Sequence, residues 1–126
     1  MINKILIVIS FFVSGFLQAQ NAKDVFEAFR GGDVETVVKA MDRDIELCFD
    51  DNVEFMDKKQ AAFALKAFFK RNPPMSFKRL HNGNSMQSKY VIARYRSSNG
   101  NNFRVYIFAK QGQENFKIQE LRFDKV

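Results

Sequence analysis

The 126-residue chain has 20 lysine and arginine residues against 14 aspartate and glutamate residues, a net charge of +6 at pH 7. A chain of this length usually forms one domain, and two domains would not fit. Its only cysteine, Cys48, has no partner for an internal disulfide, so the apolar core alone must hold the fold. Fifteen phenylalanines and no tryptophan indicate that this core is built from aromatic packing.

The first nineteen residues have the pattern of a cleavable secretory signal peptide. Lys4 gives a positive start, residues 5–17 are apolar or small, and Ala19 is a small residue at the cleavage position. This stretch is shorter than the roughly 20 residues that a membrane-spanning helix needs. We therefore expect cleavage near Ala19, a periplasmic or secreted domain formed by residues 20–126, and no stable membrane anchor after cleavage.

The charge of the expected mature domain favours some partners over others. Cleavage removes one lysine and no acid, so 19 basic and 14 acidic residues remain, a net charge of +5. A modest positive field favours anionic partners such as polyanions, membrane surfaces or acidic ligands. Export argues against a nucleic-acid partner, so a small apolar or anionic ligand, or a second copy of the chain, is the expected partner.

Two short helices are predicted at the start of the domain. The first carries apolar residues at helical spacing and is stopped by two glycines; these residues are Val25, Phe26, Phe29, Gly31 and Gly32. Asp33 caps the second helix, whose apolar residues are Val34, Val37, Val38 and Met41.

Two short strands follow. Apolar and polar residues alternate over residues 45–50, a turn follows at residues 50–52, and residues 53–55 continue as a second strand. Cys48 lies on the polar side of this alternation, so we expect it to be partly exposed. Its acidic neighbours raise the pKa of a thiol, which favours an inert cysteine over a nucleophile.

The strongest helical pattern comes next. Asp57 and Gln60 form a capping box at its start, and the sequence Asn72-Pro73-Pro74 ends it. Its polar face and the following strand carry a basic set that either binds an anionic partner or is an ordinary solvated face: Lys58, Lys59, Lys66, Lys70, Arg71, Lys78 and Arg79.

Four strands separated by short polar loops are predicted in the second half, at residues 75–82, 89–97, 103–110 and 116–124. Such loops favour an antiparallel meander. In the last strand the apolar residues switch from even to odd numbers, which predicts a β-bulge near Gln119 and Glu120.

This order of elements, with Asn-Pro-Pro after the long helix, the strand FRVYIF at 103–108 and the ending FKIQELRF at 116–123, resembles the nuclear transport factor 2-like superfamily. More narrowly, it is similar to small exported bacterial domains of unknown function in that superfamily. The resemblance covers residues 21–126. It implies an α+β fold in which N-terminal helices and one long helix pack on the concave side of a curved antiparallel sheet, a conical half-barrel.

The resemblance also implies a cavity between the long helix and the sheet, and dimerisation through the outer face of the sheet. Members of the superfamily include isomerases, dehydratases, cyclases, binding proteins and dimerisation modules, so the fold does not decide the activity. Ketosteroid isomerase-like members place a carboxylate base and a tyrosine or acid donor in the cavity. No aligned tyrosine and aspartate motif is found in this sequence.

The candidate ligand-binding residues are His81, Arg94, Arg104, Tyr106 and Arg122. His81 is the only histidine, and an imidazole can act as an acid or a base, but no nearby serine, cysteine or aspartate completes a nucleophile set. The arginines, with Arg96, lie on the meander and share one sheet face with Tyr106. If that face lines the cavity, they bind a carboxylate or similar anion; if it faces outward, they are surface or dimer residues.

The aspartates do not predict a metal site. Their spacing lacks the glycine and terminal glutamate of a calcium loop, and helix caps and turns explain them: Asp42, Asp44, Asp50, Asp51 and Asp57. We expect no metal and no cofactor.

Two functions follow from these observations. The first is a non-enzymatic exported domain that binds a small ligand or a protein partner through its cavity or its sheet face. The alternative is a cryptic isomerase or hydratase in which His81 or a buried aspartate acts as the base. The enzyme requires a deep pocket where that base meets a second polar group.

Overall fold

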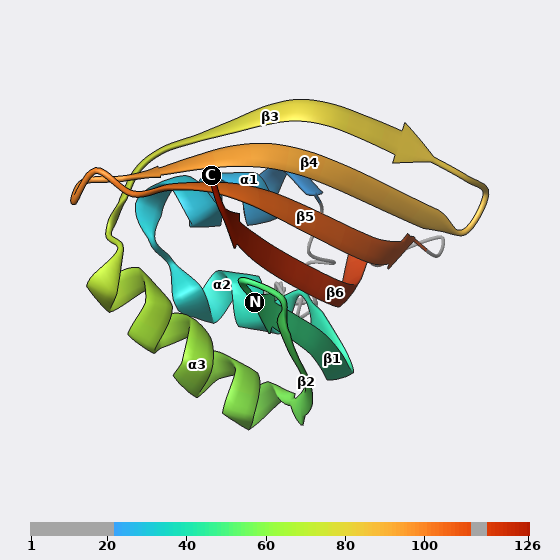
Figure 1. Cartoon of the computed structure of the whole chain (residues 1–126). Coiled ribbons are helices and arrows are strands. Elements are labelled where there is room, and N and C mark those ends of the chain that lie inside the picture. Colours follow the sequence, from blue (N-terminus) through green and yellow to red (C-terminus); the bar gives the residue numbers. More distant parts are fainter. Residues whose placement is uncertain (1–21, 112–115) are drawn as a thin grey trace, which may run out of the picture.

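The computed structural model describes residues 22–111 and 116–126 (Figure 1). In chain order the elements are α1 (Ala22–Gly31), α2 (Val34–Lys39), β1 (Met41–Phe49), β2 (Asn52–Asp57), α3 (Lys58–Arg71), β3 (Pro74–Asn84), β4 (Ser88–Ser97), β5 (Asn102–Gln111) and β6 (Phe116–Lys125). The predicted signal peptide lies outside the described residues. No helix within the described part of the chain is long and apolar enough to cross a membrane.

The strands form one six-stranded sheet in the order β2-β1-β6-β5-β4-β3. The four C-terminal strands make the predicted meander, but β1 pairs with β6 in parallel, so the sheet is mixed and not antiparallel throughout. Hairpin loops connect β1 to β2, β3 to β4 and β4 to β5. Because β1 and β6 are not hairpin neighbours, no short loop forces them to run in opposite directions.

The predicted helices are confirmed, with one correction. The capping box of Asp57 and Gln60 is formed at the start of α3, and Asn72 is its C-cap. Asp33 caps α2, accepting a hydrogen bond from the backbone N–H of Thr36. However, α2 ends at Lys39, and Met41 begins β1, where it lies opposite Ile118 in β6.

Register shifts between neighbouring strands show bulges in β6 and β3 and an irregularity in β1. In the β5–β6 ladder Phe108 pairs with Glu120 and Ala109 with Ile118, which leaves Gln119 as the extra residue at the predicted position. A second bulge, which the sequence pattern did not indicate, leaves Leu80 unpaired in β3. Bulges increase local bending and twist, consistent with the curvature of the sheet in Figure 1.

The three helices of the described residues lie on one side of the curved sheet (Figure 1). Aromatic rings fill the space between these helices and the sheet. Phe68 of α3 lies at the centre, with its ring centroid 4.4 Å from that of Phe123 and 4.9 Å from that of Phe103. Phe29 of α1 stacks on Phe77 of β3 at 4.8 Å. The expected aromatic core therefore forms on the concave side.

Cys48 is buried, contrary to the expected partial exposure. Its strand lies between β2 and β6, so Val53 and Arg122 flank it on either side. Burial raises the pKa of its thiol, although the positive charge of Arg122 opposes this shift. The environment therefore favours the inert thiol.

Candidate functional site

The sequence-predicted site residues lie on the outer face of the sheet. The odd-numbered residues are buried over 91–97 of β4 and 103–109 of β5, so the even-numbered ones between them point to the opposite face. Arg94, Arg104 and Tyr106 belong to this outward set. Register places Arg122 beside Tyr106 from β6, and His81 beside Ile92 from β3.

Among the described residues, the centre of the concave side has little free space for a ligand. The two hollows beside the core phenylalanines, where α3 meets the sheet, have volumes of about 200 and 210 Å³. Larger grooves open only at the rim, of about 520 Å³ between α3 and β2 and about 590 Å³ between α1 and β3. Pockets for drug-sized ligands usually measure about 300–1,000 Å³. The phenylalanines of the core occupy the region where the resemblance implied a cavity.

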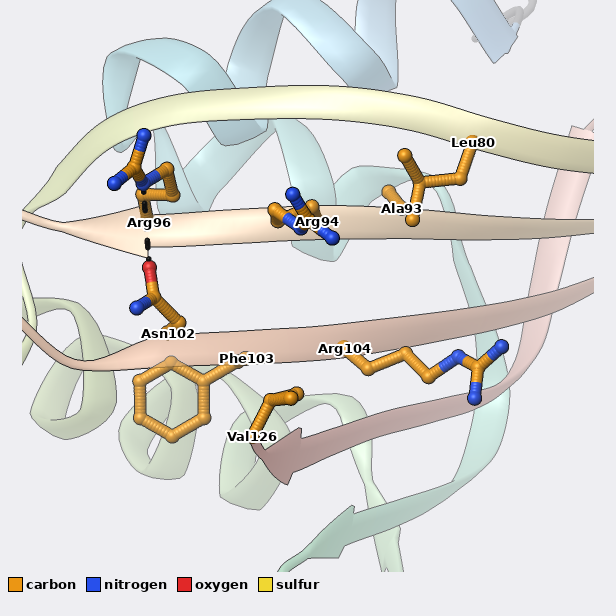
Figure 2. Close-up of a pocket in the computed structure, with 8 residues that line it drawn as sticks. All are labelled: Leu80, Ala93, Arg94, Arg96, Asn102, Phe103, Arg104 and Val126. Atoms are coloured by element: carbon orange, nitrogen blue, oxygen red, sulfur yellow. Dashed lines mark hydrogen bonds between the residues drawn. The ribbon is translucent and has the colours of Figure 1, made fainter.

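A larger pocket, of about 520 Å³, lies on the outer face of β3, β4 and β5 (Figure 2). Arginine side chains dominate its polar lining, and its apolar lining includes Leu80 and Val126, which are 48% and 84% exposed. Figure 2 shows Arg94 standing out from β4, while Arg104 extends along the sheet away from Arg96. The pocket therefore presents guanidinium groups in several directions.

Three cations lie side by side across three strands. Lys78 of β3 is the register partner of Arg94, and Arg94 is the register partner of Arg104. Like charges directly opposite each other on neighbouring strands destabilise a sheet. We call these three residues, together with Arg96, the cation row.

Within the described residues, no member of the cation row forms an ion pair with a carboxylate. Asp124 lies opposite Arg104 in the register, but its carboxylate is not within ion-pair distance. The Nε of Arg96 donates a hydrogen bond to Oδ1 of Asn102 at 3.3 Å, a neutral acceptor. No carboxylate of the described residues therefore forms an ion pair with the row, and Asp124 is an acidic cross-strand neighbour at its Arg104 end.

Arg122 lies apart from the cation row, among acids. Its guanidinium is 3.7 Å from a carboxylate oxygen of Asp51 and 3.8 Å from one of Glu120. Burial and the nearby Glu46 raise the pKa of Glu120, and Arg122 opposes this shift. The outer face thus carries its free cations on β3 to β5 and most of its carboxylates on β6 and β1.

An aromatic cluster lies between these two regions. It consists of two cross-strand pairs on β4 and β5, Tyr90 with Phe108 and Ile92 with Tyr106, all half-buried although no helix covers them. The rings of Tyr90 and Tyr106 stack with centroids 6.4 Å apart. Gly83 leaves room for Tyr90, because a Cβ there would be 2.2 Å from the tyrosine ring.

His81 has a tyrosine neighbour but no acid in contact. Its Nε2 is 3.2 Å from the hydroxyl of Tyr90, and both groups are near the solvent. Among the described residues the buried polar side chains are Asn72 and Ser97, neither of which is an acid. The base that the enzyme hypothesis requires is therefore not found in the described interior.

The described residues also offer no group of three or more histidine, cysteine, aspartate or glutamate side chains that would hold a metal ion.

The cation row includes a residue that sequence reasoning had assigned elsewhere. Lys78 was grouped with the basic residues around the long helix, because the parity of a single strand does not show which residue it faces on the next. The register of β3 with β4 supplies that information, and the bulge at Leu80 changes the parity after residue 79. The acid cluster around Arg122 depends equally on the parallel pairing of β1 with β6.

The comparisons place the fold among known proteins. The model of the DUF4783 family, described as a domain of unknown function, matches residues 22–124. A DUF4783 family protein from Bacteroides ovatus is 32% identical, with 85% of this chain and 96% of that chain covered and a TM-score of 0.79. Its counterpart from Bacteroides uniformis is 28% identical, with 83% and 96% covered and a TM-score of 0.78.

More distant structures share the fold alone. A nuclear transport factor 2-like (NTF2-like) protein from Cytophaga hutchinsonii is 14% identical, with 82% of this chain and 91% of that chain covered and a TM-score of 0.60. No curated protein matches the chain. The predicted NTF2-like fold is confirmed, and these likenesses carry no activity with them.

Proposed function

This chain belongs to the DUF4783 family and has an NTF2-like fold, and we propose that it is an exported, non-enzymatic domain that binds an anionic ligand on the outer face of its sheet. The observation that carries the proposal is the cation row, in which Arg94 lies between Lys78 and Arg104 with no carboxylate paired to any of them. The ligand is a small molecule or group with two or more carboxylate or phosphate oxygens.

The chemistry of the pocket supports this class of ligand. Guanidinium groups bind carboxylates and phosphates through two parallel N–H···O bonds, which gives orientation as well as affinity. Two arginines on adjacent strands repel each other when the site is empty, and a bound dianion removes that repulsion. The pocket is open to solvent, so we expect moderate affinity that weakens as salt is added.

The experiment is a titration of residues 20–126 with citrate, followed by isothermal calorimetry at low and high salt. We expect saturable binding to the wild-type domain and its loss in the double variant Arg94→Gln, Arg104→Gln. The double variant Lys66→Gln, Lys70→Gln removes two charges from the exposed face of α3 and is the matched control. Equal binding by all three proteins would contradict the proposal.

A second use of the same face is favoured by its charge distribution. Its free cations lie on β3 to β5, and Glu46, Glu120 and Asp124 lie on β1 and β6. A two-fold axis parallel to the strands would place the cation row of one copy over the acids of the other, with the aromatic cluster at the centre. In such a homodimer, each copy would contact the other through this face.

Size-exclusion chromatography with light scattering tests the homodimer. We expect the mass of a dimer, and of a monomer for Tyr106→Arg, which places a charge in the aromatic cluster. A strict monomer at high concentration would contradict this second use and leave the anionic ligand as the function of the face.

The cryptic isomerase or hydratase is the weaker candidate. It needs a deep pocket in which His81 or a carboxylate meets another polar group, whereas His81 is exposed on the outer face. Nothing in the described geometry favours it over binding.

A further inference from the structure

The strand β3 carries positive charge on both sides of the sheet edge. Lys78 lies opposite Arg94 in the cation row and also lines a second groove, of about 590 Å³, between α1 and the edge of the sheet. The basic residues of this α1–β3 groove are Lys23, Arg30, Lys78, Arg79 and Lys89. Lys78, in the lining of the groove, is therefore the cross-strand neighbour of Arg94, in the lining of the outer-face pocket.

The charge of the α1–β3 groove is almost entirely positive. Glu27 is the only acid in its described lining. Glu27 forms an ion pair with Arg30, whose Nη1 lies 2.6 Å from a Glu27 carboxylate oxygen. Arg30 also donates a hydrogen bond from Nε to the backbone carbonyl of Phe77 at 3.0 Å. The remaining basic side chains of the groove form no ion pair within the described part of the chain.

Part of the groove is held in place before any ligand binds. The guanidinium of Arg79 lies 5.7 Å from the ring centroid of Phe26, a cation–π contact that orients its N–H groups. Arg30 is fixed by its two hydrogen bonds. Positions fixed in the free protein reduce the entropy lost on binding.

An apolar side chain lies next to the groove residues in the sequence. Leu80 follows Arg79 in the chain, lines the outer-face pocket and is 48% exposed at the bulge. We call the positive surface from Lys23 and Arg79 through Leu80 to Arg94 and Arg104 the cationic strip. A single small anion would occupy only one end of it.

We propose that the cationic strip binds an acidic polypeptide segment that wraps around the β3 edge, with carboxylates on the cations and an apolar side chain on Leu80. Positive charge at both ends of the strip requires a ligand with several separated negative charges. The exposed leucine between them favours a polypeptide, which alternates acidic and apolar side chains, over a sulfated polysaccharide. This inference rests on the proposed anion site and extends it around the edge.

The test uses a fluorescein-labelled dodecapeptide of alternating glutamate and leucine, with anisotropy as the measurement. The groove variant Lys23→Gln, Arg79→Gln should bind this peptide about tenfold more weakly, because two exposed charge contacts are lost. The control Lys66→Gln, Lys70→Gln should stay within about twofold of the wild type on the same grounds. Circular dichroism and urea midpoints confirm that each variant is folded.

Citrate binding separates this inference from the proposed function. The groove variant should bind citrate as the wild type does, because its outer-face pocket is intact. Peptide affinity equal to that of the wild type in the groove variant would overturn the extended site and leave the citrate site standing. Failure of citrate to bind the wild type, with peptide binding still dependent on the groove, would overturn the proposed function alone.

A leucine variant decides the class of ligand. Leu80→Ser should weaken peptide binding about fivefold through lost apolar contact, while leaving competition by dextran sulfate unchanged. Met75→Ser is the matched control, since Met75 is 62% exposed on the same strand and lines neither site. If Leu80→Ser leaves peptide affinity unchanged, or if dextran sulfate binds more tightly than the peptide, the polypeptide assignment is overturned.

Discussion

Arg94 is needed for the proposed anion binding, but its charge lowers the stability of the empty protein. It faces a cation on both neighbouring strands, Lys78 and Arg104, so replacing it with glutamine should stabilise the empty protein. We expect Arg94→Gln to raise the free energy of unfolding by about 0.5 kcal/mol in low salt. Urea denaturation measures this change, and the gain should disappear in about 0.5 M NaCl because salt screens exposed charges.

Arg43→Gln is the control, since Arg43 is an exposed arginine on β1 outside the cation row. Added citrate should reverse the order of stability, because a ligand that binds only the folded wild type stabilises it. If Arg94→Gln does not raise the free energy of unfolding at low salt, the cation row does not destabilise the fold.

At the scale of single elements, a side-chain hydrogen bond connects the bulge in β6 to β1, in addition to the pairing of the two strands. The Nε2 of Gln119 donates a hydrogen bond to Asp42 at 2.6 Å, and this bond, with the backbone N–H of Arg43, lowers the pKa of Asp42. A lowered pKa in the folded state adds stability above the ordinary value of 3.8 that is lost as the pH falls through the folded value.

Asp42→Asn should therefore cost about 1 kcal/mol at neutral pH, the net size of one typical intramolecular hydrogen bond. The difference in free energy of unfolding between wild type and variant should shrink as the pH falls from about 5 to about 2. Urea denaturation across that range measures it, with Asp44→Asn, an exposed aspartate of the same strand, as the control. A difference independent of pH would contradict the role given to the Asp42 charge.

The elements differ in how well local sequence predicts them. Three predicted features depend only on residues close together in the sequence, and all three are found: the capping box at Asp57, the proline stop after Asn72 and the parity switch at Gln119. The parallel pairing of β1 with β6 and the burial of Cys48 depend on residues far apart in the chain. Periodicity gives which side chains share a face, but only strand register shows that Lys78 meets Arg94.

At the scale of the whole molecule, aromatic rings fill the centre of the concave side, and the candidate anion site lies on the outer face instead. Phe68 lies at that centre, 3% exposed and in ring contact with five neighbours: Phe49, Phe69, Tyr95, Phe103 and Phe123. Phe68→Ala should lower the free energy of unfolding by about 3–5 kcal/mol, because a buried ring is replaced by a cavity. Thermal and urea denaturation measure this loss.

The same variant should gain a binding site that the wild type lacks. Apolar cavities of this kind stay dry and bind small apolar molecules, so we expect benzene to raise the melting temperature of Phe68→Ala but not that of the wild type. Phe63→Ala is the matched control, since Phe63 is on the same helix and 81% exposed. If Phe68→Ala proves too unstable, Phe68→Leu leaves a smaller cavity. Binding of benzene by the wild-type domain would show that the concave side is open. The concave side would then be a second candidate ligand site beside the one on the outer face.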